Sequence, residues 1–170
     1  MDYDALFHRL HPALYRYLYR LTGDADTADD IAQETFVRLL RQSMPESEVR
    51  PWLFTVATNL VRDGVRKAGR RQRLLAAERF MPASVPRPDE MADRAEQVEL
   101  VRRALAQIPL RDRQLLLMRE EGFTYEEMAR AAGVAPGSVG TLLGRALRRF
   151  AQVYRAQDGR AHEETDGTRG

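Results

Sequence analysis

The stretch "TYEEMARAAGVAPGSVGTLLGRALRRF", residues 124–150, decides the fold, because it contains the signals for two helices and the turn between them. Thr124 can cap the first helix, and Glu127, three residues later, completes a capping box. Gly133 supplies the left-handed residue that ends this helix, and Pro136 suits the start of the next one. This succession predicts a helix-turn-helix motif.

The second helix of the motif has an apolar and a polar side. Its apolar residues recur at helical spacing and predict a buried stripe of Val139, Leu143, Ala146 and Phe150. The opposite arc carries hydroxyls and arginines suited to the DNA major groove, and the candidate residues are Ser138, Thr141, Arg145 and Arg148. A plain helical hairpin with a solvated basic face is the alternative, and glycines at 137, 140 and 144 remove side chains that could read bases. The caps and the turn together favour DNA binding.

Outward from this motif, apolar residues recur at intervals of three and four, which predicts an all-α fold. The other expected helices cover residues 3–21, with a kink or restart at Pro12, and 26–41, 51–68, 92–107 and 110–120. The run "MPASVPRPDE", residues 81–90, contains three prolines, which predicts that it is part of a linker. We therefore expect two small helical domains, 1–76 and 94–155, joined by a flexible linker, 77–93, and followed by a disordered tail, 156–170.

The composition excludes several kinds of protein. The 170 residues contain no apolar run as long as a membrane span, so we expect no membrane insertion. They contain no cysteine, which excludes disulfides and thiolate metal sites. His8 and His11 lie one turn apart near Asp4, but structural histidines are favoured over a metal site because no further ligand is close in sequence. Without a phosphate-binding glycine loop or a nucleophile beside a base, the sequence predicts no enzyme, no cofactor and no metal.

The stretch "RPWLFTVATNLVRDGVRKAGRR", residues 50–71, predicts a second nucleic-acid surface. On a helical wheel, an apolar arc holds Leu53, Val56, Ala57, Leu60, Gly64 and Ala68, and Phe54, Val61 and Val65 extend it. The opposite arc and its edge hold Trp52, Thr55, Asn59, Arg62, Asp63, Arg66, Lys67 and Arg70. An aromatic ring beside an amide and guanidinium groups can stack on an unpaired base and hold its phosphates. For Trp52 alone, burial under the preceding loop is an equal alternative. For the arc as a whole, the density of arginines from Arg62 to Arg73 favours nucleic acid.

The helix expected at 26–41 predicts a protein contact. Its outer side carries the carboxylates of Asp30 and Glu34 around Val37, with Gln33 beside them. An exposed valine between carboxylates suits a basic partner helix better than a random surface, although single exposed apolar residues are common.

Three segments together resemble bacterial RNA polymerase sigma factors of the sigma-70 family, in the extracytoplasmic-function (ECF) group. "LYRYLYRLTGDADTADDIAQETFVRLL", residues 14–40, is similar to the polymerase-binding part of region 2, and residues 50–71 to the part that melts and reads the −10 element. "IPLRDRQLLLMREEGFTYEEMARAAGVAPGSVGTLLGRALRRF", residues 108–150, is similar to region 4. A linker that joins these two regions directly is the arrangement of the ECF group.

This resemblance implies roles for individual residues. Asp30, Gln33 and Glu34 match the helix that docks on the polymerase clamp. Trp52, Thr55, Asn59, Asp63, Arg66 and Lys67 match positions that open the strands and capture a flipped −10 base, and Arg70 and Arg71 match the basic end that holds the backbone. Ser138, Thr141, Arg145 and Arg148 fall on the −35 recognition helix. After Val139, family members often carry lysine-serine-arginine where this chain has Gly140, Thr141 and Leu142, which predicts weaker phosphate binding.

The resemblance also implies partners. We expect a cytoplasmic sigma factor that binds core RNA polymerase and promoter DNA, both duplex and melted. We also expect an anti-sigma factor to control it. A stand-alone helix-turn-helix regulator and a helical adaptor that sequesters a protein partner are the alternatives. A plain regulator has no need of the Trp52 arc or of the acidic helix, whereas the glycine-rich recognition helix gives some support to the adaptor.

Overall fold

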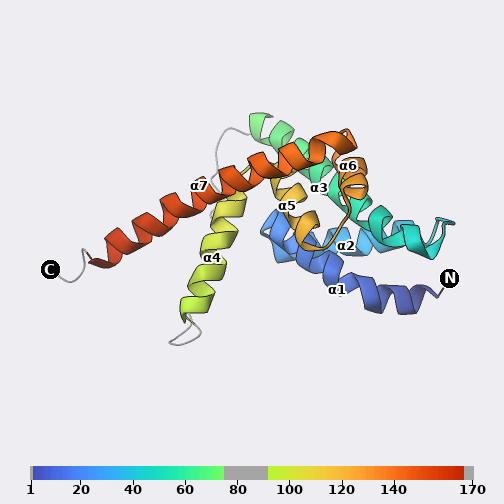
Figure 1. Ribbon diagram of the computed structural model, residues 1–170. Helices are drawn as coiled ribbons and strands as arrows, with labels where there is room; N and C mark the ends of the chain where they lie inside the picture. The colour runs from blue at the N-terminus through green and yellow to red at the C-terminus, as the bar shows by residue number, and fades with distance from the viewer. Residues whose placement is uncertain (1, 75–91, 167–170) are drawn as a thin grey trace.

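The computed structural model describes residues 2–74 and 92–166, and all its regular elements in those ranges are helices (Figure 1). The elements are α1 (Tyr3–Thr22), α2 (Ala25–Leu39), α3 (Glu46–Leu74), α4 (Ala92–Gln107), α5 (Leu110–Glu120), α6 (Tyr125–Ala132), a 3-10 turn (Pro136–Ser138) and α7 (Val139–Asp166). The predicted all-α fold is confirmed. Most of the predicted linker lies outside the described residues, while its last two positions begin α4.

Local signals explain where the first two helices begin and end. The Asp2 carboxylate accepts a hydrogen bond from the amide of Ala5 at 3.1 Å and caps α1. Gly23 has a φ of 76° and ends this helix in the left-handed conformation. The Asp24 carboxylate then caps α2 through the amide of Thr27, at 2.8 Å. Pro12 lies inside α1, so the restart that the sequence suggested at this proline does not occur.

Two helices are longer than the sequence predicted. α3 begins at Glu46 and not at Pro51, because the acidic residues Glu46 and Glu48 favour the N-terminal turn of a helix. α7 continues to Asp166, so residues 156–166, expected to be a disordered tail, are helical. Their polar composition hid a run of good helix formers such as alanine, glutamine, arginine and glutamate.

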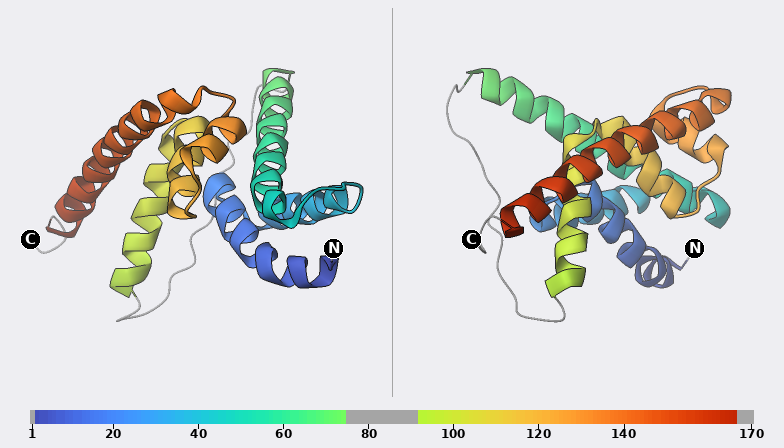
Figure 2. Two further views of the ribbon diagram at one scale, coloured as in Figure 1. Left: turned by 45° about the vertical axis from the view of Figure 1, so that its right-hand side comes forward. Right: turned by 60° about the vertical axis from the view of Figure 1, so that its left-hand side comes forward.

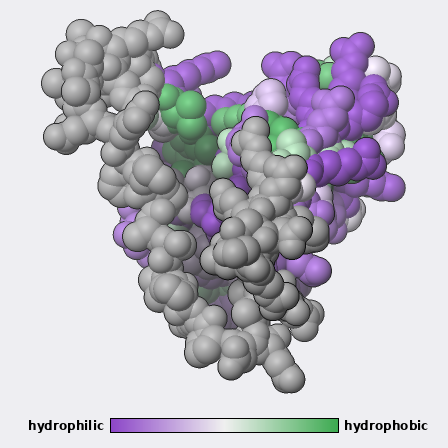
Figure 3. Space-filling model, turned by 90° about the vertical axis from the view of Figure 1, so that its left-hand side faces the viewer, coloured by the Kyte–Doolittle hydropathy of each residue, from purple (hydrophilic) through white to green (hydrophobic). Residues whose placement is uncertain are grey.

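The helices form two halves that pack against each other (Figures 1 and 2). The two halves share one hydrophobic core. The N-terminal half, residues 2–74, is the bundle of α1, α2 and α3; the C-terminal half, residues 92–166, contains α4 to α7. α6 packs on α3, and α5 packs on α1, so the buried cluster runs without interruption from Leu6 to Val139. Figure 3 shows apolar patches among hydrophilic residues on one face of the molecule. On α4 and α7, Val98 and Leu147 are exposed.

Candidate nucleic-acid and polymerase interfaces

One side of α3 is buried and the other carries polar side chains. The residues buried on this helix after Arg50 are Leu53, Phe54, Ala57, Thr58 and Val61. Asn59, Asp63, Arg66 and Lys67 are exposed on successive turns, and we call these four residues the α3 face. The face therefore presents one amide, one carboxylate and two cations from a single rigid helix.

The buried arc of α3 differs from the predicted one. Val56 and Leu60 are only half-buried, and Gly64 and Ala68 are exposed, whereas Thr58 is completely buried. Inside the core, the Thr58 hydroxyl lies 2.7 Å from the hydroxyl of Tyr17 on α1. This polar partner satisfies the buried hydroxyl of Thr58, which a helical wheel drawn from hydropathy does not anticipate.

Trp52 and Thr55 lie at the edge of the α3 face. Trp52 is half-buried and packs against the hydrophobic core. It is therefore partly a packing residue and partly accessible, which combines the two roles that the sequence left open. The Thr55 hydroxyl donates to the Pro51 carbonyl at 2.8 Å and is also half-buried. Arg70 and Arg71 belong to the last turns of α3, and their side chains lie outside the described residues.

Arg62 points toward the C-terminal half, although the sequence placed it on the outward arc. Its guanidinium donates to the Gln114 side-chain oxygen on α5 at 2.5 Å and to the Ala131 carbonyl on α6 at 3.3 Å. Partial burial lowers the pKa of Arg62 from its ordinary value. Arg62 thus joins the two halves of the chain in this structure.

The outer side of α2 combines carboxylates with an apolar groove. Asp30, Gln33, Glu34 and Val37 are all exposed there, as the sequence predicted. Local contacts orient the side chains: Gln33 donates to Asp29 at 2.6 Å, and Arg38 donates to Glu34 at 2.7 Å.

The groove itself was not predicted from the sequence. It is lined by Tyr3, Phe7, Gln33, Phe36, Val37, Leu39 and Leu40. The ring of Phe7 lies 4.9 Å from that of Phe36, which joins α1 to the α2 surface. The regular four-residue spacing of Tyr3, Phe7, His11, Tyr15 and Tyr19 along α1 was the available signal for an aromatic ridge beside α2.

The helix-turn-helix forms as the sequence predicted. The Thr124 hydroxyl accepts from the Glu127 amide at 3.3 Å, and the Glu127 carboxylate accepts from the Thr124 amide at 2.8 Å, which completes the capping box. Gly133 has a φ of 67° and ends α6. Pro136 begins the short 3-10 turn that precedes α7.

The first turns of α7 present the predicted polar arc. Ser138, at the end of the 3-10 turn, and Thr141, Arg145 and Arg148 on α7 are all exposed. Val139 and Ala146 are buried, and Leu143 and Phe150 are half-buried, so the predicted apolar stripe is the inward side. An ion pair between Arg149 and the buried Asp112 of α5, at 2.5 Å, fixes α7 on the C-terminal half.

The two N-terminal histidines are explained by local packing. His8 lies 3.5 Å from the Asp4 carboxylate on the surface of α1, and the His11 ring lies 4.6 Å from that of Phe7. Within residues 2–74 and 92–166, no cluster of three or more metal-ligating side chains occurs. Among the helices described, none is long and apolar enough to cross a membrane.

Both halves of the chain match known protein families. Residues 6–71 match the family model of sigma-70 region 2, and residues 99–150 match that of sigma-70 region 4. The ECF RNA polymerase sigma factor EcfG of Rhodopseudomonas palustris is 34% identical over 146 residues, which cover 84% of this chain and 79% of EcfG. The ECF sigma factor SigE of Mycolicibacterium smegmatis is 32% identical over 81% of this chain, which spans only 56% of SigE.

Solved structures share the fold. The sigma factor RpoE of Bartonella quintana, solved in complex with the anti-sigma factor NepR, superposes with a TM-score of 0.73 at 23% identity, over 91% of this chain and 97% of that one. The PhyRSL–NepR complex of Sphingomonas sp. Fr1 gives a TM-score of 0.64 at 21% identity, over 92% of this chain and 91% of that one.

Proposed function

Because the chain belongs to the ECF group of the sigma-70 family of RNA polymerase sigma factors, we propose that its exposed helical faces divide the work of promoter recognition. The N-terminal half docks on core polymerase and opens the −10 element, and the C-terminal half contacts the −35 element. The protein performs no covalent chemistry of its own. It acts in the cytoplasm, where core polymerase and promoter DNA are found.

The α3 face carries the proposal for strand opening. Asn59 is exposed on α3, so its side-chain amide is accessible to hold the edge of a base. Arg66 and Lys67 both follow about two helical turns later and can neutralise the phosphates beside that base. Trp52, half-exposed at the start of the same arc, offers a ring for stacking. Arg70 and Arg71 follow in the sequence and are proposed to hold the strand's backbone.

The α2 surface is proposed to bind core polymerase. Its carboxylates, Asp30 and Glu34, attract a basic partner, and the groove beside Val37 accepts an apolar side chain of that partner. Interfaces of this kind gain specificity from the charges and much of their affinity from the buried apolar contact.

The α7 arc is proposed to contact duplex DNA at the −35 element. Ser138 and Thr141 can reach base edges or phosphates, and Arg145 and Arg148 can reach guanine or phosphate. Because Gly140 replaces a cation that many family members carry, we expect this contact to be weaker than in those members. Control by an anti-sigma factor is part of the proposal, since the relatives of similar fold were solved with such partners.

The experiment that tests this proposal separates polymerase binding from strand opening. Asn59→Ala should bind core polymerase with unchanged affinity but form open complexes about 10-fold to 100-fold more slowly, as the loss of one base contact worth about 1–3 kcal/mol implies. Core affinity is measured by fluorescence anisotropy, and opening by 2-aminopurine fluorescence at the −10 element. Arg16→Ala, which removes an exposed residue of α1 outside the α3 face, is the control. Equal loss of binding and opening in Asn59→Ala would contradict the assigned role.

A further inference from the structure

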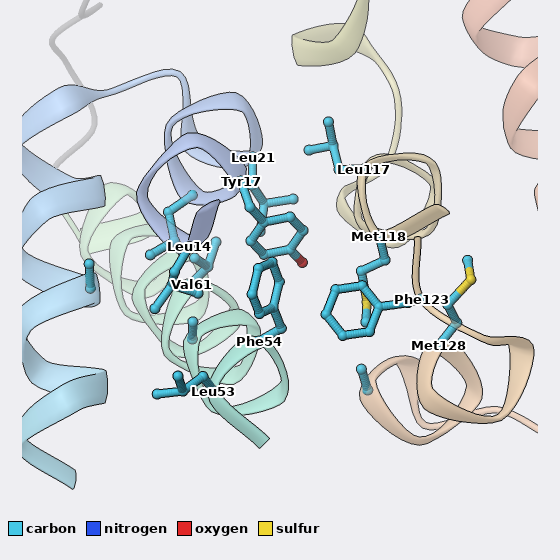
Figure 4. Packing of buried hydrophobic residues seen from close by; sticks show 14 of the residues in the cluster. Leu14, Tyr17, Leu21, Leu53, Phe54, Val61, Leu117, Met118, Phe123 and Met128 are labelled. Carbon is cyan, nitrogen blue, oxygen red and sulfur yellow. The ribbon is translucent and has the colours of Figure 1, made fainter. Parts of the chain in front are cut away.

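Apolar packing holds α3 beside the corner between α5 and α6. Phe123, in the turn between α5 and α6, faces Phe54 of α3 with 4.7 Å between the ring centres (Figure 4). Both side chains are completely or almost completely buried, together with Tyr17 of α1 and Met118 of α5. Because such an interior is close-packed, side chains that project from α3 and α5 beside it have fixed positions relative to one another.

Arg62 lies next to this packed contact and is oriented by two helices of the C-terminal half. Its guanidinium donates to the Gln114 side-chain oxygen of α5 at 2.5 Å and to the Ala131 carbonyl of α6 at 3.3 Å. A guanidinium has five N–H donors, and these two contacts use two of them. Arg62 can therefore hold a further acceptor without giving up either contact.

Two more arginines lie close to Arg62. Arg66 follows Arg62 by one turn of α3, and Arg111 precedes Gln114 by about one turn of α5. Both of these arginines are exposed. Burial lowers the pKa of Arg62, and the neighbouring cations Arg111 and Arg66 lower it as well. Three cations, contributed by both halves of the chain, are thus within electrostatic reach of one another.

A compact phosphate chain suits this arrangement better than a nucleic-acid strand. Guanidinium groups bind phosphate through paired N–H donors, and several of them around one point can balance the multiple charges of a di- or triphosphate. The phosphates of a single strand are spread along its backbone. A strand that follows α3 would therefore meet Arg66 without requiring Arg111, so the participation of α5 favours the compact anion.

We propose that Arg62, Arg66 and Arg111 form a binding site for a free oligophosphate, either an inorganic chain or the phosphates of a nucleotide. Arg62 is the oriented anchor, and the other two arginines contact the anion from α3 and from α5. Because both halves contribute to the site, the bound anion stabilises their contact by an amount that grows with its concentration relative to its dissociation constant. This site goes beyond the proposed function and needs neither polymerase nor promoter DNA.

Isothermal titration calorimetry with inorganic tripolyphosphate, at constant pH and ionic strength, tests the site. Arg111→Gln should weaken binding about 10-fold or more, because it removes one cation that contacts the anion. Arg103→Gln is the matched control: it makes the same charge change at an arginine of α4 that Glu99 already pairs at 3.1 Å, and it should leave the affinity unchanged. Adenosine triphosphate in the same titration distinguishes a nucleotide, which would bind more tightly than tripolyphosphate, from an inorganic chain.

Urea unfolding shows whether the variants are folded and links the site to stability. Without phosphate, Arg111→Gln should be at least as stable as the unaltered chain, because it relieves repulsion among like charges. Added tripolyphosphate should raise the urea midpoint of the unaltered chain and of Arg103→Gln, and should raise that of Arg111→Gln less.

A single-stranded oligodeoxythymidine separates the oligophosphate site from the α3 face. Arg66→Gln should weaken binding of both ligands, whereas Arg111→Gln should weaken only that of tripolyphosphate. The inference is wrong if tripolyphosphate does not bind the unaltered chain, if Arg111→Gln binds it normally, or if Arg111→Gln weakens both ligands equally. Equal weakening by Arg103→Gln would reveal attraction to net charge alone and would also overturn it. None of these results depends on whether the chain initiates transcription, so failure of the site and failure of the proposed function are distinguishable.

Discussion

Tyr17 illustrates how a polar partner can satisfy a hydroxyl that is buried in the core. Its hydroxyl lies 2.7 Å from that of Thr58, whose own hydroxyl donates to the Phe54 carbonyl at 2.7 Å. Burial raises the pKa of Tyr17 well above its ordinary value, so the phenol stays neutral in the folded protein.

This raised pKa predicts a loss of stability in alkali. A group whose folded pKa exceeds its unfolded pKa contributes stability below the unfolded value and loses it as the pH rises further. Stability should therefore fall above about pH 10, where tyrosines of the unfolded chain ionise. Tyr17→Phe should lower the free energy of unfolding by about 1 kcal/mol near neutral pH, because its hydrogen bond is lost. Above pH 10, the free energy of unfolding of this variant should fall less steeply than that of the unaltered chain. Urea unfolding at several pH values measures both effects; an unchanged alkaline slope would contradict this explanation.

A substitution at Val37 tests the proposed polymerase-binding surface of α2. Val37→Glu places a charge at the groove edge and should weaken binding to core polymerase about 10-fold, as expected for a residue that contributes more than 1 kcal/mol. Val98→Glu makes the same change at an exposed valine of α4 and should leave core affinity unaltered. Titration of fluorescent protein with core polymerase compares the two variants. If the two variants bound core polymerase with equal affinity, α2 would not be part of the docking surface.

The candidate residues show what a sequence can and cannot place. Asn59, Asp63, Arg66 and Lys67 were correctly expected on an exposed arc, because helical spacing alone determines which residues share a side. Arg62 was expected on the same arc, but the structure turns it toward Gln114. Spacing within one helix carries no information about which distant segment packs against its edge.

At the scale of elements, the start of α7 allows a test of the weak −35 contact. A Cβ added at Gly140 would lie 3.6 Å from the Tyr125 ring, an ordinary contact, so larger residues fit there. Gly140→Lys adds a cation on the exposed arc and should steepen the dependence of log affinity on log salt by about 0.9 for duplex promoter DNA. Gly159→Lys, the same change farther along α7, should leave this slope unaltered. Identical slopes for the two variants would argue against DNA contact by the first turns of α7.

The existence of each helix could be predicted, but several boundaries could not. Capping residues and left-handed glycines gave the turn at Gly133 and the end of α1 at Gly23, because these signals are local. The start of α3 at Glu46 and the extension of α7 to Asp166 were missed. In both places moderate helix propensity competes with a proline or a polar composition, and no single residue decides the outcome.

At the scale of the whole molecule, the sequence predicted two helical units but not their shared core. Phe54 and Phe123 each belong to an apolar pattern that a separate domain could bury by itself. Their contact joins residues 69 positions apart, which periodicity cannot reveal. The contact between the two halves, and with it the hydrogen bond from Arg62 to Gln114, follows only from the three-dimensional structure.

The most direct test of the central claim is run-off transcription on genomic DNA of the source organism with purified core polymerase. Addition of this protein should give discrete transcripts that core polymerase alone does not produce, and Asn59→Ala should reduce them about 10-fold or more while core binding is retained. If core polymerase bound the protein yet no promoter-specific transcript formed, or if Asn59→Ala transcribed as well as the unaltered chain, the role assigned to the α3 face would be contradicted.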